Sequence, residues 1–253
     1  MEGSTPPIKS VLRAFEVLQA IWEHDQVGPS ELSDHLDVSK STAHVYLRTL
    51  ESTGYVVNDD GTYRLSYKFL SMGSRLKFRS RLFHTARDVM AALAEETGEL
   101  VALFVEEDGR SILLHQETGD RSLQLGTYPG MSLPLHSHAS GKLFLAHMNP
   151  QRRSEVIDRY GLEAVTEETI TDRANLESVL EKIRETGFAF DCDQQVTGMG
   201  TVSLPVFVES EVKATLAVAS PTGRLQNESY RQELLQQLRG AVDTLGINYR
   251  YQN

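Results

Sequence analysis

The stretch from Gly28 to Tyr67, GPSELSDHLDVSKSTAHVYLRTLESTGYVVNDDGTYRLSY, decides how the first part of the chain folds. Pro29-Ser30 opens a first helix with Ser30 as its N-cap, and after a short polar turn Ser39 can cap a second helix. Gly54 is expected to end the second helix, because glycine is the residue that most often follows a helix C-terminus. The pattern predicts two short helices joined by a tight turn.

Two runs of alternating residues follow this helix pair. Tyr55–Val57 and Thr62–Leu65 flank the sequence Asn58-Asp59-Asp60-Gly61, which is a strong signal for a β-hairpin. Helix, tight turn, helix and hairpin form a winged helix-turn-helix, which places its second helix in the major groove of DNA. The alternative is a small helical hairpin without a nucleic-acid partner, and the spacing of the hairpin favours the winged domain.

The second helix has one apolar face and one open face. Ala43, Leu47 and Leu50 recur at helical spacing and should face the core. On the open face, short polar side chains suit base edges or phosphates, and an arginine fork can bind a phosphate or a guanine. Basic residues of the hairpin suit the DNA backbone. The predicted DNA-binding residues are Ser39, Lys40, Ser41, Thr42, His44, Val45, Arg48, Arg64 and Lys68.

Composition sets the class of protein. The chain has 253 residues, enough for two domains, with 40% hydrophobic and 24% charged residues. No apolar run approaches the ~18 residues of a membrane span. A single cysteine, Cys192, excludes an internal disulfide and fits a reducing cytoplasm. We therefore expect a cytoplasmic protein without a membrane partner.

The charge is unevenly distributed along the chain. The formal net charge is −10, yet the segment 61–87 contains seven basic residues and no Asp or Glu. Local field rather than net charge steers a DNA ligand, so this basic segment supports the DNA interpretation. The acidic remainder has two open explanations. One is a halophilic origin, because screening at high salt removes carboxylate repulsion. The other is the ordinary acidity of a mesophilic protein.

The remaining segments predict a second domain. After a short leader through Pro7, we expect domains at 1–73 and 99–253, joined by a linker helix at 74–98 that belongs to neither core. Helices and strands together indicate an α+β fold with an antiparallel sheet. Expected helices are Ile8–Glu23, Ser80–Thr97, Ala139–Met148, Gln151–Tyr160, Ala174–Thr186 and Tyr230–Tyr249, and expected strands are Leu100–Val105, Ser111–Gln116, Leu123–Leu125, Thr201–Val208 and Ala214–Ala219.

Three separated motifs carry a family resemblance. These motifs are the run PLHSHASGKLFLA at 134–146 and the segments 171–189 and 198–206. Together with Ile8-Lys9-Ser10-Val11-Leu12-Arg13-Ala14-Phe15 and the helix pair, they resemble an IclR-type transcriptional regulator in the right order. The resemblance covers nearly the whole chain. It implies a GAF-like effector domain that binds a small organic molecule, coupled to an operator-binding winged helix in a homodimer or homotetramer.

The resemblance also implies positions for the effector site. A helix beginning near Ala139 would offer backbone N–H groups to a carboxylate, which favours an anionic effector over another polar one. Thr201 stands where many members have a cysteine, and an ordinary strand threonine is an equal interpretation. The effector-binding residues expected by matching are His136, His138, Ala139, Asp191, Thr201 and Ser220.

Other functions fit the residues less well. His136 and His138 form an H-x-H pair, but a structural zinc would lack two further ligands, so we predict no metal and no cofactor. An enzyme would need an activated nucleophile, and Asp191 and Asp193 beside Cys192 disfavour its thiolate. We therefore predict no enzymatic activity. A winged domain used only for protein contacts is a further alternative, which the basic segment 61–87 disfavours.

Overall fold

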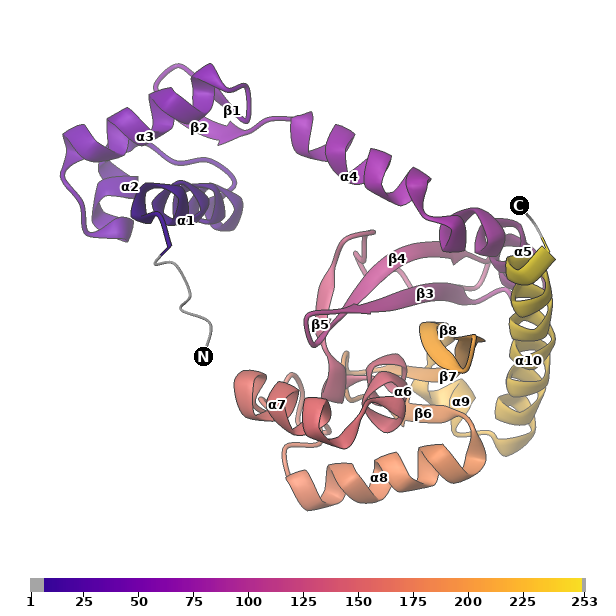
Figure 1. Cartoon of the computed structure of the whole chain (residues 1–253). Helices are drawn as coiled ribbons and strands as arrows, with labels where there is room; N and C mark the ends of the chain where they lie inside the picture. The colour runs from indigo at the N-terminus through magenta and orange to yellow at the C-terminus, as the bar shows by residue number, and fades with distance from the viewer. Residues whose placement is uncertain (1–6, 252–253) are drawn as a thin grey trace. The chain divides into compact units, whose positions relative to one another are not determined.

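The computed structural model describes residues 7–251 and divides the chain into two compact units, Met1–Leu76 and Lys77–Asn253 (Figure 1). Most of the predicted leader, residues 1–6, lies outside the described residues. The boundary falls inside a helix, three residues after the predicted end of the first domain. Among residues 7–251, no helix is both long enough and apolar enough to cross a membrane.

The first unit is a winged helix-turn-helix, as predicted. Its elements are α1 (Lys9–His24), α2 (Pro29–Leu36), α3 (Lys40–Ser52), β1 (Val56–Asp59) and β2 (Thr62–Leu65), followed by α4 (Lys68–Arg79), which contains the boundary. Strands β1 and β2 pair antiparallel, with Asp59 opposite Thr62. Asp60 and Gly61 form the turn, both with positive φ, which matches the twist of a tight hairpin.

One detail of this unit differs from prediction. Gly28, not Ser30, is the N-cap of α2. Pro29 with its fixed φ takes the first helical position, which places Ser30 one residue inside the helix. In α1 the buried residues are Val17, Ala20 and Ile21, whereas Phe15 is exposed.

Helix α4 was predicted only in part, because the linker helix expected at 74–98 includes its residues 74–79 but not 68–73. It runs from Lys68 to Arg79 and has no buried residue. Phe69, Met72 and Leu76 recur in it at helical spacing, yet none of them is buried. The segment 69–73 was interpreted only as chain that leaves the wing, so the first half of α4 was missed.

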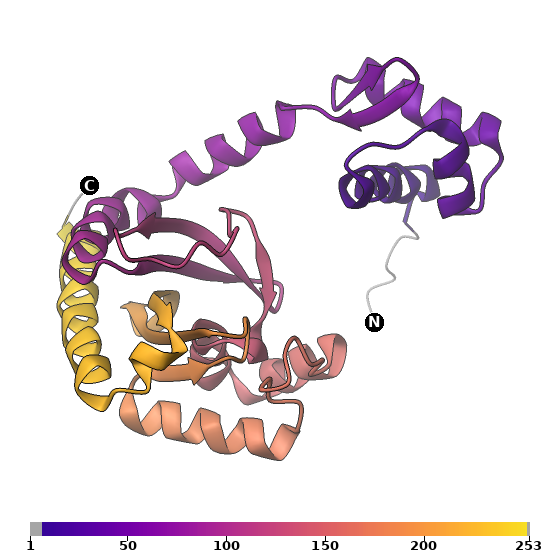
Figure 2. The ribbon, with the colours of Figure 1, turned by 180° about the vertical axis from the view of Figure 1, so that it is seen from behind.

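The second unit is built on one antiparallel sheet of six strands in the order β5-β4-β3-β8-β7-β6 (Figure 2). The predicted α+β class is confirmed, although Leu123–Leu125 is not a strand and three short elements, β5, β6 and α9, were missed. The bounds are α5 (Arg81–Thr97), β3 (Leu100–Glu107), β4 (Arg110–Thr118), β5 (Ser132–Pro134), a 3₁₀ turn (Leu135–Ser137), α6 (Ala139–His147), α7 (Pro150–Tyr160), α8 (Arg173–Thr186), β6 (Ala189–Cys192), β7 (Met199–Val208), β8 (Glu211–Pro221), α9 (Thr222–Leu225) and α10 (Glu228–Tyr251).

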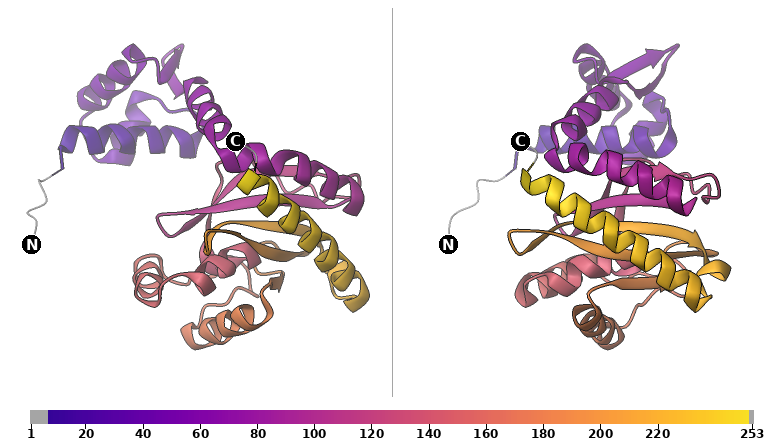
Figure 3. Two further views of the ribbon diagram at one scale, coloured as in Figure 1. Left: turned by 45° about the vertical axis from the view of Figure 1, so that its right-hand side comes forward. Right: turned by 90° about the vertical axis from the view of Figure 1, so that its right-hand side faces the viewer.

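Helices α5 and α10 lie side by side across one face of this sheet (Figure 3). Met90 of α5 and Leu238 of α10 pack with Val101 and Leu103 of β3 in the largest buried cluster. The prediction that the helix at Ser80–Thr97 lies outside both cores is therefore wrong. Its apolar stripe faces the sheet, so it belongs to the second unit.

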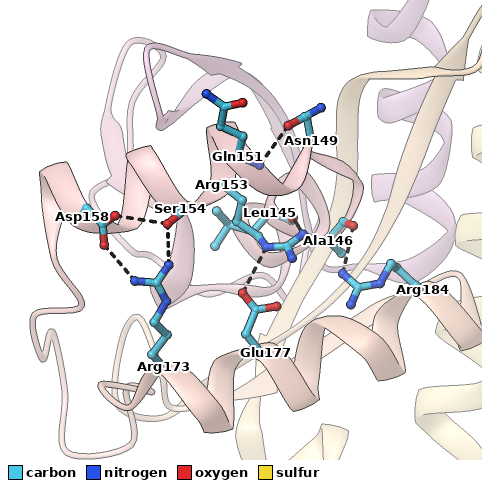
Figure 4. A network of polar contacts seen from close by, with 10 residues as sticks. All are labelled: Leu145, Ala146, Asn149, Gln151, Arg153, Ser154, Asp158, Arg173, Glu177 and Arg184. Atoms are coloured by element: carbon cyan, nitrogen blue, oxygen red, sulfur yellow. Dashed lines mark hydrogen bonds and ion pairs between the residues drawn. The ribbon is translucent and has the colours of Figure 1, made fainter.

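Helices α6 and α8 cover the opposite face of the sheet, with α7 beside them. Polar side chains tie these three helices together, as Figure 4 shows. Arg153 of α7 pairs with Glu177 of α8, with Nε 3.1 Å from Oε1. Arg184 of α8 donates to the carbonyl of Ala146 at 3.2 Å, near the end of α6. These contacts fix α6, whose first turn lies beside the cavity described below.

Candidate DNA interface and ligand cavity

The N-terminus of α3 is built by three hydroxyl side chains. Ser39 caps the helix, because its Oγ accepts a hydrogen bond from the backbone N–H of Thr42 at 3.2 Å. The same Oγ lies 2.8 Å from the hydroxyls of Ser41 and Thr42. The predicted cap is thereby confirmed. The backbone N–H groups at a helix N-terminus and nearby exposed hydroxyl groups can donate hydrogen bonds to a phosphate oxygen.

The two faces of α3 are as predicted. Ala43, Leu47 and Leu50 are buried, and the predicted DNA-binding residues from Ser39 to Arg48 are all exposed. The Arg48 side chain is 63% exposed, and its Nε lies 3.7 Å from Glu51 Oε2. An exposed pair at that distance is weak and exchanges easily for a phosphate or a base. Contact with DNA stays a prediction for each of these residues.

The two basic residues beyond the helix have partners within the unit. Arg64 of β2 pairs with Asp59 of β1, with Nε 2.6 Å from Oδ2. Lys68 donates its ammonium to the carbonyl of Thr53 at 2.8 Å and lies over the ring of Tyr55. Lys68 therefore stabilises the carbonyl end of α3, which carries a partial negative charge. Their predicted role at the DNA backbone remains a prediction.

A cavity of about 190 Å³ lies in the second unit, on the face of the sheet that α6 covers. Alternation along β3 places Ala102 in its wall, while Val101 and Leu103 face α5 and α10. Most of its lining side chains are apolar, and none carries a permanent charge. The lining residues are Leu100, Ala102, Phe104, Leu113, Gln116, Leu125, Thr127, Met131, Leu133, His138, Gln195, Val196, Met199, Thr201, Ala217 and Ala219.

His138, the N-cap residue of α6, lies in this wall as a buried, neutral imidazole. Its side chain is 3% exposed, and its ring lies 5.1 Å from the ring of Phe104. Burial, with the nearby charge of Lys142, lowers the pKa of His138 to about 3. Its Nε2 is buried and has no hydrogen-bond partner among the described residues. A neutral imidazole with an unsatisfied nitrogen indicates a missing partner in the cavity.

The N-terminus of α6 does not have the open geometry that we expected. The backbone N–H of Ala139 donates to Oδ2 of Asp191, so a carboxylate of the chain itself holds this site. Burial raises the pKa of Asp191, and the charge of Lys142 partly offsets that effect. Lys142 is buried too and donates to Gln194 Oε1 at 2.5 Å. The prediction that Ala139 offers its N–H to an effector carboxylate is wrong.

The remaining predicted effector residues divide between the cavity and other sites. Thr201 lines the cavity, whereas His136 contacts the carbonyl of Glu163 through Nε2 at 2.9 Å and lines a different, small hollow. The hydroxyl of Ser220 donates to Glu99 Oε1 at 3.1 Å. Of the six residues predicted, only His138 and Thr201 line the cavity.

Sequence reasoning missed three polar lining residues. Gln116 and Thr127 bond each other, with Thr127 donating to Gln116 Oε1 at 2.6 Å. Gln195 accepts a hydrogen bond from the hydroxyl of Ser137 through Oε1. None of them belongs to a motif, so only the tertiary fold reveals them. Within residues 7–251, no group of three or more His, Cys, Asp or Glu side chains is placed to hold a metal ion.

Comparison with known proteins assigns the chain. Residues 78–246 match the bacterial transcriptional regulator IclR C-terminal domain, and residues 10–60 match the IclR helix-turn-helix domain. The chain belongs to the IclR family. It is therefore a helix-turn-helix transcriptional regulator, and the predicted resemblance is confirmed.

Individual relatives cover almost the whole chain. The HTH-type transcriptional regulator KdgR of Escherichia coli K12 is 29% identical over 247 residues, 96% of this chain and 94% of KdgR. The crystal structure of Thermotoga maritima IclR matches with a TM-score of 0.76 at 27% identity, covering 96% of this chain and 99% of that chain. An IclR homolog from Microbacterium hydrocarbonoxydans, complexed with 4-hydroxybenzoate, shares the fold with a TM-score of 0.77 at 23% identity, covering 95% and 97%.

Proposed function

We propose that this regulator binds an operator through the exposed face of α3, and that a small organic effector in the cavity changes its operator affinity. The observation that carries the effector proposal is the cavity wall, where His138 has a buried nitrogen without a partner. The relative complexed with 4-hydroxybenzoate is consistent with a small organic ligand. Both events would take place in the cytoplasm, where operator DNA is accessible.

The first test is Arg48→Ala in the recognition helix. We expect operator binding to weaken by about 1–3 kcal/mol if Arg48 reads a base edge, with a smaller loss on random DNA. Fluorescence anisotropy with DNA from upstream of the regulator's own gene measures both affinities. Arg239→Ala on the exposed face of α10 is the matched control and should leave both unchanged.

Two results would contradict this interpretation of α3. The first is equal affinity of the wild-type chain for its upstream DNA and for scrambled DNA of the same length. Alternatively, Arg48→Ala would reduce both affinities equally, which would assign Arg48 to the phosphate backbone rather than to base recognition.

An apolar face of α1 supports self-association. Phe15 is 67% exposed, and Val11 and Leu12 beside it are about half exposed. Soluble monomers rarely leave neighbouring large apolar side chains in water, and helix-turn-helix proteins pair to bind two half-sites. We propose a second copy of the chain as the partner of this face, in a dimer or a tetramer.

The test of this interface is Phe15→Glu, which places a charge in the proposed contact. Analytical ultracentrifugation should show dissociation of the oligomer or a smaller assembly, and operator affinity should fall because one half-site is lost. Ser10→Glu adds the same charge to an exposed position of α1 away from this face and should change neither property. An unchanged sedimentation profile for Phe15→Glu would exclude this face.

Strand β4 offers a route from the cavity to α4. Gln116 lines the cavity, and its neighbours His115 and Glu117 bond each other, with Nε2 2.8 Å from Oε1. Nδ1 of His115 lies 2.9 Å from the ammonium of Lys77, which is in the last turns of α4. We propose that a shift of β4 on effector binding acts on α4 through this His115–Lys77 contact.

His115→Ala should uncouple the two sites. An effector found by thermal-shift screening should bind the variant with unchanged affinity, while its influence on operator affinity falls from the expected 5- to 150-fold toward none. Leu114→Ala, one residue earlier on β4, is a control for general weakening of the strand. If His115→Ala responds to effector like the wild type, coupling runs elsewhere.

We propose no catalytic role for the chain's single cysteine, Cys192. Burial raises the pKa of Cys192, and Asp191 and Asp193 raise it further. The nucleophilic thiolate is therefore disfavoured at neutral pH. This supports a regulator that binds its effector without converting it.

A further inference from the structure

The cavity wall restricts the chemical class of the effector. Eleven of the sixteen lining residues are apolar, and the other five are Gln116, Thr127, His138, Gln195 and Thr201. Gln116 and Thr127 satisfy each other through two hydrogen bonds. The polar residues that remain for a ligand are His138, Gln195 and Thr201, while the rest of the wall offers apolar contact.

The size of the cavity gives a second restriction. An apolar cavity of about 150 Å³ is known to hold benzene, and this one is about 190 Å³. A single six-membered ring with a small substituent therefore fills it. A sugar acid or a short keto acid would leave its several polar groups facing leucine, methionine and alanine side chains, at a cost for each unpaired group.

Charge gives the third restriction. No lining side chain is a cation, and the nearest buried ammonium, that of Lys142, is not in the wall. It already donates to Gln194, and Asp191 is its electrostatic partner. An effector carboxylate would be buried without a counter-ion of its own, which is strongly unfavourable.

We propose that the effector is a compact, uncharged and mostly apolar molecule, of the size of a substituted ring, with one hydrogen-bonding group paired to His138. This inference rests on the proposed function, in which a small organic molecule occupies the cavity. Phe104 packs beside the His138 ring and supplies an apolar surface for the ring of the ligand. His138 is thus the residue that determines specificity, through an imidazole that stays neutral.

Three matched probes test this inference by calorimetry on the full chain. They are 4-methylphenol, toluene, which lacks the hydroxyl, and benzoate, which adds a charge. At about pH 7.5 the phenol is uncharged, because phenolic groups ionise near pH 10. We expect 4-methylphenol to bind about five- to tenfold more tightly than toluene, as one net hydrogen bond predicts. Benzoate should bind more weakly than either.

Two variants assign the binding to this cavity. His138→Phe keeps the ring and removes the nitrogen atoms, so 4-methylphenol and toluene should bind it equally. Ala102→Leu adds three carbon atoms inside the cavity and should abolish binding of both probes. Thermal unfolding of each variant confirms that it is folded before binding is compared.

Several outcomes would overturn the inference. These are tightest binding by benzoate, a hydroxyl preference that survives in His138→Phe, unchanged binding in Ala102→Leu, or no binding of any probe to the wild type. Failure of the proposed function is a different result. It would appear as no operator preference without ligand, or as no small molecule that changes operator affinity, whichever probe binds.

Discussion

Replacing Arg224 with Met is expected to lower the free energy of unfolding of the second unit by about 3 kcal/mol, the lower end for breaking a buried ion pair. Glu99, just before β3, is fully buried, and Arg224 of α9 holds it with Nη1 2.6 Å from Oε1. The hydroxyls of Ser220 and Tyr230 also donate to Oε1. Without the guanidinium, a buried carboxyl group loses its counter-ion.

The other carboxylate oxygen makes this effect larger. Oε2 of Glu99 is buried and has no hydrogen-bond partner among the described residues. The electrostatic stabilisation of this oxygen therefore comes from the guanidinium of Arg224. The contact also joins the start of β3 to α9, immediately before α10, so its loss loosens the packing of α10 on the sheet.

The measurement is chemical denaturation of the full chain followed by two signals. The single tryptophan, Trp22, lies in the first unit, so its fluorescence reports that unit. Circular dichroism also reports the second unit. Arg224→Met should move only the part of the transition that Trp22 does not follow. A fall of less than about 1 kcal/mol would show that the exposed third of Arg224 is already hydrated and contributes little.

A double-mutant cycle supplies the control. Glu99→Gln removes the charge but keeps the shape, and should cost less than Arg224→Met, since Arg224 can turn to water. The double variant should recover part of the loss of Arg224→Met, because the uncompensated charge is gone. Additive effects of the two substitutions would exclude the pair as the cause.

Much of the first unit follows from local sequence. Ser39 caps α3 because its hydroxyl reaches the Thr42 N–H, and Gly54 follows the helix with a φ of +77° that other residues rarely adopt. Spacing alone assigns Ala43 and Leu47 to the core. These features need only neighbouring residues, so a single sequence shows them.

Features that depend on distant partners were not predictable. Helix α5 has the amphipathic pattern of any surface helix, and only the sheet decides that it packs in a core. Leu123 and Leu125 resemble a short strand, yet they pack as irregular chain beside Leu100. Strand β5 has three residues, too few for a period of two to be visible.

In the candidate site, too, the sequence shows the features that are local and not those that depend on distant partners. The run at 134–146 correctly directed attention to the start of α6, but not to which histidine lines the cavity. His136 lies in the 3₁₀ turn and contacts the carbonyl of Glu163, whereas His138 is the N-cap residue of α6 and lines the cavity. Asp191 is fifty-two residues from Ala139 in sequence, and no local signal shows that it occupies that N–H.

His138 should also make the free energy of unfolding fall as the pH is lowered. In the folded chain its pKa is about 3, because burial and the charge of Lys142 disfavour the imidazolium. In the unfolded chain it is near 6.5. Below pH 6.5 the unfolded state therefore binds a proton that the folded state does not. The stabilisation is fully present above pH 6.5 and is lost as pH falls toward 3.

The full loss corresponds to about 5 kcal/mol, at 1.36 kcal/mol for each pH unit, and about 2 kcal/mol of it falls between pH 6.5 and pH 4.5. Other groups titrate in this range. Burial raises the pKa of Asp191 and lowers that of His136, and these act in opposite directions. The prediction therefore concerns the difference between the wild type and His138→Phe, in which such shared contributions largely cancel.

Urea denaturation of both proteins at several pH values between 6.5 and 4.5 measures this difference. The wild type should lose about 2 kcal/mol relative to His138→Phe over that interval, and the variant should have the flatter profile. The loss should appear in the circular dichroism transition and not in the Trp22 fluorescence, since His138 lies in the second unit. Parallel profiles would mean that the folded imidazole takes up its proton near the usual pH. His138 would then be accessible to water, and its role as a neutral partner for the effector would be excluded.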